Sequence, residues 1–124
     1  MDEFTRAYFE CLVWTGFYFA DETSEGEPLD DHVSVWWDHL PEDIRAQIVA
    51  DCETFQEEAG DLIAVDLDRA GHDFCLSRNR HGAGFWDGLW GSVGDYLHDV
   101  AKSYGTQTLA AFGDADDPTF DLWS

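Results

Sequence analysis

The sequence predicts an α+β protein, a single acidic domain over residues 1–124, in which helices pack on a small antiparallel sheet of β-hairpins. A chain of 124 residues fits one domain. Apolar residues make up 44% of it and aromatic residues 15%, a composition too apolar for a disordered acidic tail. Segments with helical spacing alternate with short segments between turn residues, an order typical of the α+β class.

Three segments have the apolar spacing of helices. Residues 4–19 form the first, although the aromatic run at its end also fits a strand. Residues 41–59 begin with a proline and two acids, as helices often do, and residues 93–104 end before a capping glycine, Gly105. The stripe expected to be buried on the middle helix comprises Ile44, Ile48, Cys52, Phe55, Ala59 and Leu62.

Two β-hairpins are expected between and after these helices. In the first, the alternating residues 72–77 and the returning strand 83–87 flank a turn at 79–82. In the second, residues 108–112 and 119–123 flank an Asp-rich turn.

The remaining segments have weaker patterns. Residues 21–31 are an acid-rich loop, residues 33–40 a short helix, and the helix that ends at residue 59 is expected to resume after Gly60 towards Asp68.

Charge is the strongest feature of the composition. The chain has 27 Asp and Glu residues against six Lys and Arg, which gives a net charge of −21. This surplus argues against direct binding to nucleic acid or to an anionic membrane. It favours a basic protein partner, with association that is fast and sensitive to salt.

Cysteine usage and the first residues indicate a compartment. Cys11, Cys52 and Cys75 are odd in number and match no zinc or redox spacing, so we expect buried structural thiols in a reducing environment. Two acids follow Met1, unlike the basic start of a secretory signal, and no run of 18 apolar residues occurs. We therefore expect a cytoplasmic protein.

A resemblance adds a genetic setting. Residues 70–87 read AGHDFCLSRNRHGAGFWD. This run resembles a motif shared by small uncharacterised proteins encoded by phages and plasmids, and the resemblance covers roughly residues 41–112. It implies a mobile element and no particular activity. The acidic N-terminal region and the Asp-rich tail depart from the usual pattern.

The same run contains the only concentration of catalytic residue types. A hairpin could bring His72, Asp73, His81 and Asp87 together for metal binding or acid–base chemistry. Their spacing matches no hydrolase, nuclease or zinc signature. The structural interpretation, in which Asp73 pairs with Arg78, is preferred, so we predict no catalytic residue, no metal and no cofactor. A small metal-dependent or acid–base enzyme is the alternative.

Tryptophans are expected in the core, because a small domain needs large side chains there. They could instead form an interaction patch, since tryptophan is enriched at interface hot spots. The residues concerned are Trp36, Trp37, Trp86 and Trp90.

The spacing of carboxylates in the acidic runs indicates a function. Carboxylates one helical turn apart lie about 5–6 Å from each other, comparable with the spacing along one phosphate strand. We expect an acidic inhibitor that mimics nucleic acid and occupies the basic site of a host restriction or CRISPR complex. The residues predicted to bind this partner are Asp43, Asp51, Glu57, Glu58, Asp61, Asp66 and Asp68.

The acidity also fits adaptation to salt. Asp is twice as frequent as Glu and Lys occurs once, as in proteins adapted to very salty cytoplasm, and this interpretation stays open beside mimicry. Calcium binding at the turn from Asp114 to Asp116 is disfavoured, because the loop lacks the twelve-residue pattern and its final Glu.

Overall fold

The structure, a computed structural model, describes residues 1–86 and 88–124. Over these residues helices pack on a small sheet, so the predicted α+β class is confirmed. The helices are α1 (Glu3–Thr15), α2 (Glu42–Ala59), α3 (Leu67–Arg78) and α4 (Gly94–Lys102). The strands are β1 (Phe17–Phe19), β2 (Glu27–Pro28), β3 (Thr108–Phe112) and β4 (Thr119–Trp123).

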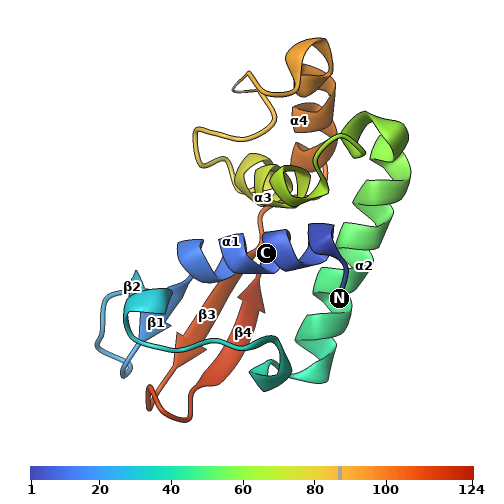
Figure 1. The fold of residues 1–124 in the computed structure, drawn as a ribbon. Helices are drawn as coiled ribbons and strands as arrows, with labels where there is room; N and C mark the ends of the chain where they lie inside the picture. The colour runs from blue at the N-terminus through green and yellow to red at the C-terminus, as the bar shows by residue number, and fades with distance from the viewer. Residues whose placement is uncertain (87) are drawn as a thin grey trace.

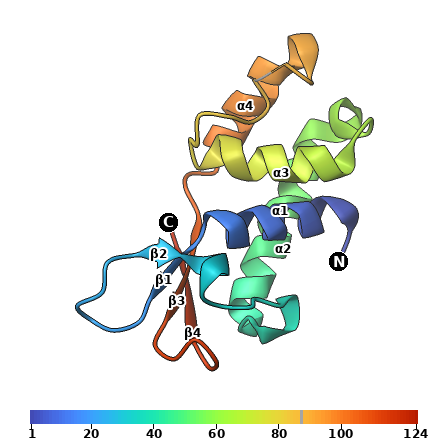
Figure 2. The same ribbon diagram turned by 60° about the vertical axis from the view of Figure 1, so that its left-hand side comes forward.

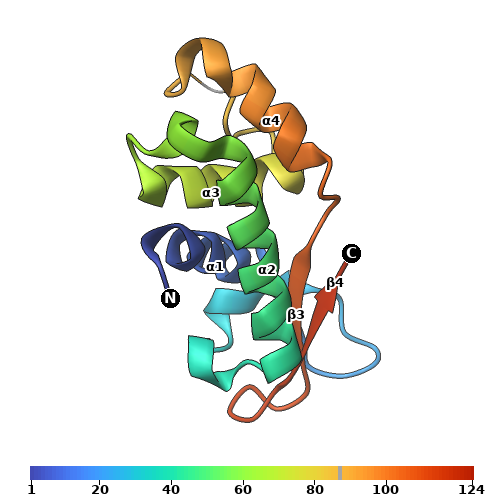
Figure 3. The same cartoon turned by 90° about the vertical axis from the view of Figure 1, so that its right-hand side faces the viewer.

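The helices stack away from the sheet. Figures 1 and 2 show α1 beside the strands, α3 on the far side of α1, and α4 beyond α3. The long helix α2 runs alongside this stack, as the side view in Figure 3 shows. Its buried side chains join those of α1 and α3 in one hydrophobic core.

The sheet is mixed, so the expectation of a purely antiparallel sheet is wrong in this detail. Its strand order is β2-β1-β3-β4, and the β3–β4 hairpin forms as predicted. Strand β1 pairs with β3 in parallel, with Phe17 opposite Ala110. Parallel strands cannot be joined by a tight turn. The connection here includes α2, α3 and α4, and hairpin signals in the sequence could not indicate it.

The first helix is shorter than predicted. It ends at Thr15, and the aromatic run that follows forms β1, which was the alternative interpretation of that run. Gly16 lies so close to β3 that a Cβ there would be 2.7 Å from the carbonyl oxygen of Leu109. Packing against the sheet thus ends the helical pattern.

The second helix is confirmed, including its buried stripe from Ile44 to Ala59. Leu62 was expected in that stripe but is 39% exposed. A 3-10 turn, η3 (Gly60–Ile63), changes the direction of the chain, and Ile63 is buried instead. The helix therefore does not continue towards Asp68.

The predicted hairpin over residues 72–87 is wrong. Residues 72–78 belong to α3, and residues 83–86 form bends and turns where the returning strand was expected. The Asp66 carboxylate accepts a hydrogen bond from the Arg69 backbone N–H at 3.0 Å and caps the helix. Ala70, Phe74 and Arg78 follow one turn apart, and all three are buried. The alternation of residues 72–77 was interpreted as a strand, although Arg78 at the end of that run is buried, which is rare for this residue type. Asp87, expected on the returning strand, lies outside the described residues.

The remaining elements differ in detail. Of the short helix predicted over 33–40, only the 3-10 turn Trp37–His39 forms. The loop predicted over 21–31 contains β2 and a 3-10 turn, Leu29–Asp31. Helix α4 is confirmed, and Gly105 follows it with φ of 76°. No helix in the described part of the chain combines the length and the apolar character needed to cross a bilayer.

Helices α1 and α3 are in close contact at Gly71. A Cβ atom there would lie 2.1 Å from the carbonyl oxygen of Phe4, which is backbone and cannot rotate away. The absence of a side chain at Gly71 therefore sets the distance between the two helices.

Replacing Gly71 with alanine is expected to destabilise the protein by about 1–3 kcal/mol or more, because α1 must move away from α3. The sign is informative, since alanine in place of glycine inside a helix ordinarily stabilises it by roughly 1 kcal/mol. Urea unfolding measures the change. Ser34→Thr, which adds one methyl group at an exposed site, is the control. A stabilised Gly71→Ala variant would show that the helices are not in close contact.

Candidate functional site

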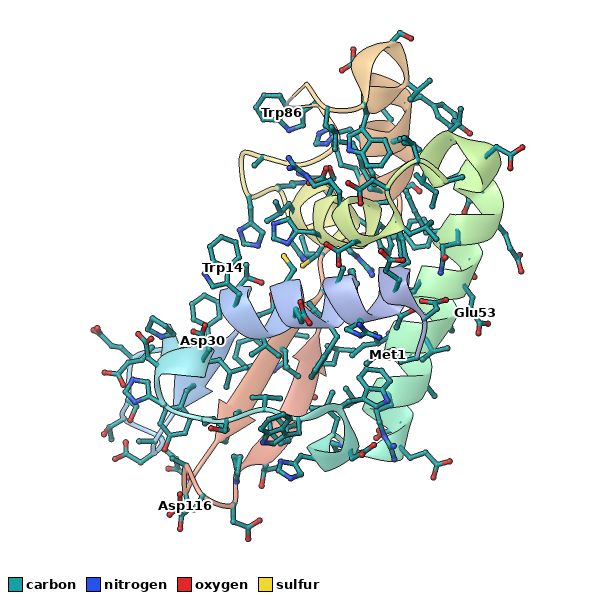
Figure 4. All side chains as sticks on the ribbon, in the orientation of Figure 1. Met1, Trp14, Asp30, Glu53, Trp86 and Asp116 are labelled. Atoms are coloured by element: carbon teal, nitrogen blue, oxygen red, sulfur yellow. The ribbon has the colours of Figure 1, made fainter. Side chains whose placement is uncertain are left out.

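The outer face of α2 carries carboxylates without cations. From Ala46 to Asp68 the sequence contains seven acidic residues and no Lys, Arg or His. Glu53 and Glu57 are four residues apart and both exposed, so they are neighbours on one helix face. In Figure 4, Glu53 projects from α2 away from the rest of the molecule. The result is an anionic surface over the C-terminal half of the helix that continues into η3 and the start of α3.

Six of the seven residues predicted to bind a partner are exposed on this surface or where it continues into η3 and α3. Two of them also have structural contacts, since Glu58 accepts a hydrogen bond from the Tyr104 hydroxyl and Asp66 caps α3. The prediction omitted Glu53, although its spacing from Glu57 could have identified it. The six exposed residues are Asp43, Glu57, Glu58, Asp61, Asp66 and Asp68.

The seventh, Asp51, is less exposed than the other six and already forms an ion pair inside the protein. It lies at the edge of α2 that faces α3, and its side chain is 28% exposed. Its Oδ2 atom accepts a hydrogen bond from Nη1 of Arg78 at 2.9 Å. Arg78 is 3% exposed, so Asp51 neutralises a buried charge, and we leave it out of the exposed acidic face.

Arg78 organises a buried polar network that connects four elements. Its Nη1 also donates to the Tyr8 hydroxyl at 3.0 Å, and its Nε donates to the carbonyl of Gly105 at 2.9 Å. The Tyr8 hydroxyl donates in turn to Oε1 of Gln107 at 2.6 Å, and burial raises the pKa of Tyr8 far above its ordinary value. The network therefore holds α1, α2, α3 and the start of β3 together.

Acids outside this surface are spread over the opposite end of the molecule. Figure 4 shows Asp30 and Asp116 near the strands, far from Glu53. Some of these acids organise local turns: Asp21 accepts hydrogen bonds from Thr23, and Asp114 accepts one from the backbone of Asp116. Negative charge is therefore a property of several faces of the protein. Residues 7–31 also contain seven acids and no Lys, Arg or His, so the face of α2 differs from them in presenting its carboxylates on a helix.

The predicted cluster of catalytic residue types does not form as expected, because there is no hairpin to bring it together. His72 is half-buried and stacks on Trp14, with ring centroids 6.1 Å apart, and His81 is exposed. Asp73 is fully buried and faces the interior. The fourth member, Asp87, is outside the described residues.

The structural interpretation of the motif assumed that Asp73 pairs with Arg78. The structure shows a different partner for Asp73. Its two oxygens accept hydrogen bonds from Nε of Arg69 at 3.1 and 3.0 Å, and Oδ2 also accepts one from the indole of Trp90 at 2.7 Å. These contacts connect α3 to the segment that precedes α4. Asp73 therefore has a structural role in the described part of the chain.

The three thiols lie in the same buried core. All three cysteines are free and buried, as predicted. Burial raises the pKa of the Cys52 thiol, and a hydrogen bond with Cys75 followed by burial raises the pKa of Cys11. Those two thiols stay protonated, which makes them poor nucleophiles. Among the described residues, no three His, Cys, Asp or Glu side chains converge as a metal site.

The tryptophans divide between core and surface. Trp90 is 6% exposed and belongs to the core, as expected. Trp37 packs edge-on against Phe9, with ring centroids 5.2 Å apart. The expectation of a core position is wrong for Trp36 and Trp86, which are 64% and 48% exposed.

Comparisons of the chain with protein-family models, with curated proteins and with solved structures each find no match.

Proposed function

We propose that the protein inhibits a host nucleic-acid-binding protein by presenting the acidic face of α2, η3 and the start of α3 to its basic groove. The observation that carries this proposal is the stretch from Ala46 to Asp68, which combines six exposed acids with no basic residue. The resemblance of residues 70–87 to proteins of phages and plasmids favours a target in the host cytoplasm, such as a restriction or CRISPR complex.

The dimensions of the helix suit such a groove. Helix α2 has 18 residues, and at 1.5 Å per residue it is about 27 Å long. One strand of B-DNA carries a phosphate about every 3.4 Å, so the helix is as long as roughly eight phosphates. Carboxylates four residues apart, such as Glu53 and Glu57, lie about 5–6 Å apart at their Cβ atoms. Flexible Lys and Arg side chains can adjust to this spacing.

The energetics favour many weak contacts over a few strong ones. One exposed ion pair contributes about 0–1 kcal/mol, so no single carboxylate on this face is expected to dominate binding. Complementary charge would raise the association rate, and salt would weaken it because exposed charges are screened beyond about 8–10 Å at physiological ionic strength.

Reversing three acids of the α2 face, Glu53, Glu57 and Asp61, to lysine is expected to abolish partner capture without unfolding the domain. The triple variant excludes Asp51, whose loss would disturb Arg78. The wild type, immobilised and exposed to a host lysate at low salt, should retain basic nucleic-acid-binding proteins that duplex DNA releases. Mass spectrometry identifies them.

A control variant with the same change in charge reverses Asp30, Asp116 and Asp117, which are exposed at the opposite end of the molecule. It should still capture the partner. Equal loss in both variants would show a general effect of net charge, and capture that DNA does not reverse would contradict mimicry. Capture that persists in high salt and depends on the exposed Trp36 would indicate a hydrophobic interaction module.

The spread of acids over several faces favours a second candidate, adaptation to high salt. Salt adaptation predicts a domain that unfolds at low salt, refolds in molar salt and does not compete with nucleic acid for any partner. Circular dichroism at low and at molar salt separates the two candidates. A domain that is fully folded at low salt would exclude salt adaptation as the reason for the charge.

A further inference from the structure

A second surface, different in character from the acidic face, gathers positive charge. Between α4 and the segment that follows α3 there is a cavity of about 370 Å³, which is within the range of small-molecule sites. It is lined by Arg80, Gly82, Trp86, His98 and Lys102. The chain has only six Lys and Arg residues, and two of them line this cavity.

Within the described residues, Arg80 and Lys102 form no ion pair with an acid of the protein. Arg45, Arg69 and Arg78 pair with Asp38, Asp73 and Asp51. Over residues 1–86 and 88–124, by contrast, neither the guanidinium of Arg80 nor the ammonium of Lys102 forms an ion pair, although the sequence has 27 acids. Arg6 is also without one there, and it lies on the exposed side of α1, away from this cavity.

The backbone of Arg80 adds an independent observation. Its φ is 58°, the only positive value among the described residues other than glycine. Arg80 follows the C-terminal cap of α3. The Arg80 N–H donates a hydrogen bond to the carbonyl of Ser77, and the His81 N–H donates one to the carbonyl of Leu76. This pair of bonds is the Schellman ending of a helix, and its left-handed residue is usually glycine. Arginine at this position costs conformational free energy that glycine would not.

Strain retained at one residue suggests that its side chain is needed. The Arg80 side chain is exposed, so it contributes no core packing that would offset this conformational cost. Lys102, in contrast, lies in the last turn of α4, where any cation stabilises the helix dipole. Arg80 is therefore the residue that best distinguishes a ligand site from a chance grouping of charges.

His98 is held in place as a third polar group of the cavity. Its Nδ1 is 3.0 Å from the hydroxyl of Ser77, which also accepts a hydrogen bond from the Phe85 N–H at 3.0 Å. Ser77 is fully buried, so it fixes the imidazole from the interior. Because Nδ1 is engaged, Nε2 is the ring nitrogen left for a ligand. Asp95 and Asp99, also on α4, are exposed and do not line the cavity.

Trp86 adds a planar apolar surface beside these polar groups. It is 48% exposed, and its ring meets that of His98 edge-on with centroids 6.4 Å apart. Figure 4 shows Trp86 at the surface beside α4, on the loop that precedes it. Indole faces stack on planar bases, and stacking of this kind tolerates every base.

We propose that this cavity binds a mononucleotide, with Arg80, Lys102 and His98 at its phosphate and Trp86 against its base. A nucleic-acid strand is disfavoured, because the net charge of −21 repels a polyanion over its whole length. A mononucleotide carries few charges and needs only this cavity. The site goes beyond the inhibitor function proposed above and uses none of the acids of α2.

The experiment is calorimetric titration of the full chain with AMP, adenosine and inorganic phosphate. AMP is expected to bind more tightly than either of its parts. Arg80→Gly should weaken AMP binding about tenfold to hundredfold, the effect of losing a hydrogen bond to a charged group. The same variant should keep or raise the urea midpoint of unfolding, since glycine suits the left-handed position. Lys102→Gln should also weaken AMP binding, and Trp86→Ala should remove the preference for AMP over phosphate.

Arg6→Gln is the control, because it changes the net charge equally at an exposed site elsewhere. Absence of AMP binding to the wild type would overturn the proposal. So would Arg80→Gly binding AMP as the wild type does, or unfolding at lower urea, which would make Arg80 a structural residue. Equal affinity for AMP and phosphate would overturn the assignment of a nucleotide. Since these variants leave the α2 face intact, this site and the inhibitor function can fail separately.

Discussion

Replacing Asp51 with alanine is expected to destabilise the protein by about 3–5 kcal/mol, because the charge of Arg78 would stay buried without a counterion. This change in the free energy of unfolding has the opposite sign to the change expected from net charge alone. A chain with a charge of −21 should gain stability when an acid is removed from its surface, since self-repulsion falls. The measurement is the free energy of unfolding in urea.

The control for this prediction is Glu53→Ala on the same helix. Glu53 is exposed, so its removal should change stability by no more than about 0.5 kcal/mol. If Asp51→Ala and Glu53→Ala have equal effects, the contact with Arg78 contributes nothing. In that case Asp51 would return to the set of residues available to a partner.

Phe55→Ala is expected to have an effect of similar size, about 3–5 kcal/mol, because it opens a cavity at the centre of the aromatic core. Phe55 is fully buried and stacks on Phe74 and Phe85, with ring centroids 4.3 and 5.5 Å away. Removal of its ring would also leave Phe4, whose centroid is 5.8 Å away, without a partner on one side.

Urea unfolding again measures the loss, and Val65→Ala is the comparison. Val65 is 84% exposed, so its truncation should be nearly neutral. A small effect of Phe55→Ala would mean that neighbouring rings collapse into the space, and it would contradict the central position assigned to this residue.

Local patterns predicted α2, α4 and the β3–β4 hairpin well. In these elements the signal lies within a short window: a stripe from Ile44 to Ala59, a capping glycine at 105, and an Asp-rich turn. Long-range packing was not visible in such windows. The end of α1 depends on the approach of Gly16 to β3, and the parallel pairing of β1 depends on residues at the other end of the chain.

The errors in the candidate site have two physical causes. Alternation over residues 72–77 was interpreted as a strand, but these residues belong to α3, so no hairpin gathers the catalytic residue types. Arg78 is buried against expectation, and it engages Asp51, which the helical period alone had placed among the exposed acids. Exposure of Glu57 and Glu58 followed from the helical period of α2, whereas Asp61, Asp66 and Asp68 are exposed in η3 and at the start of α3, which lie outside that helix.

The parallel pairing of β1 with β3 has a consequence for folding during synthesis. Phe17 and Ala110 are neighbours in the sheet but are 93 positions apart in the chain (110 − 17). During synthesis, β1 leaves the ribosome long before its central partner exists, and it can only pair with the two residues of β2. Contacts of such high sequence separation slow folding. The sheet can close only after β3 and β4 have been synthesised, so it cannot grow strand by strand from β1.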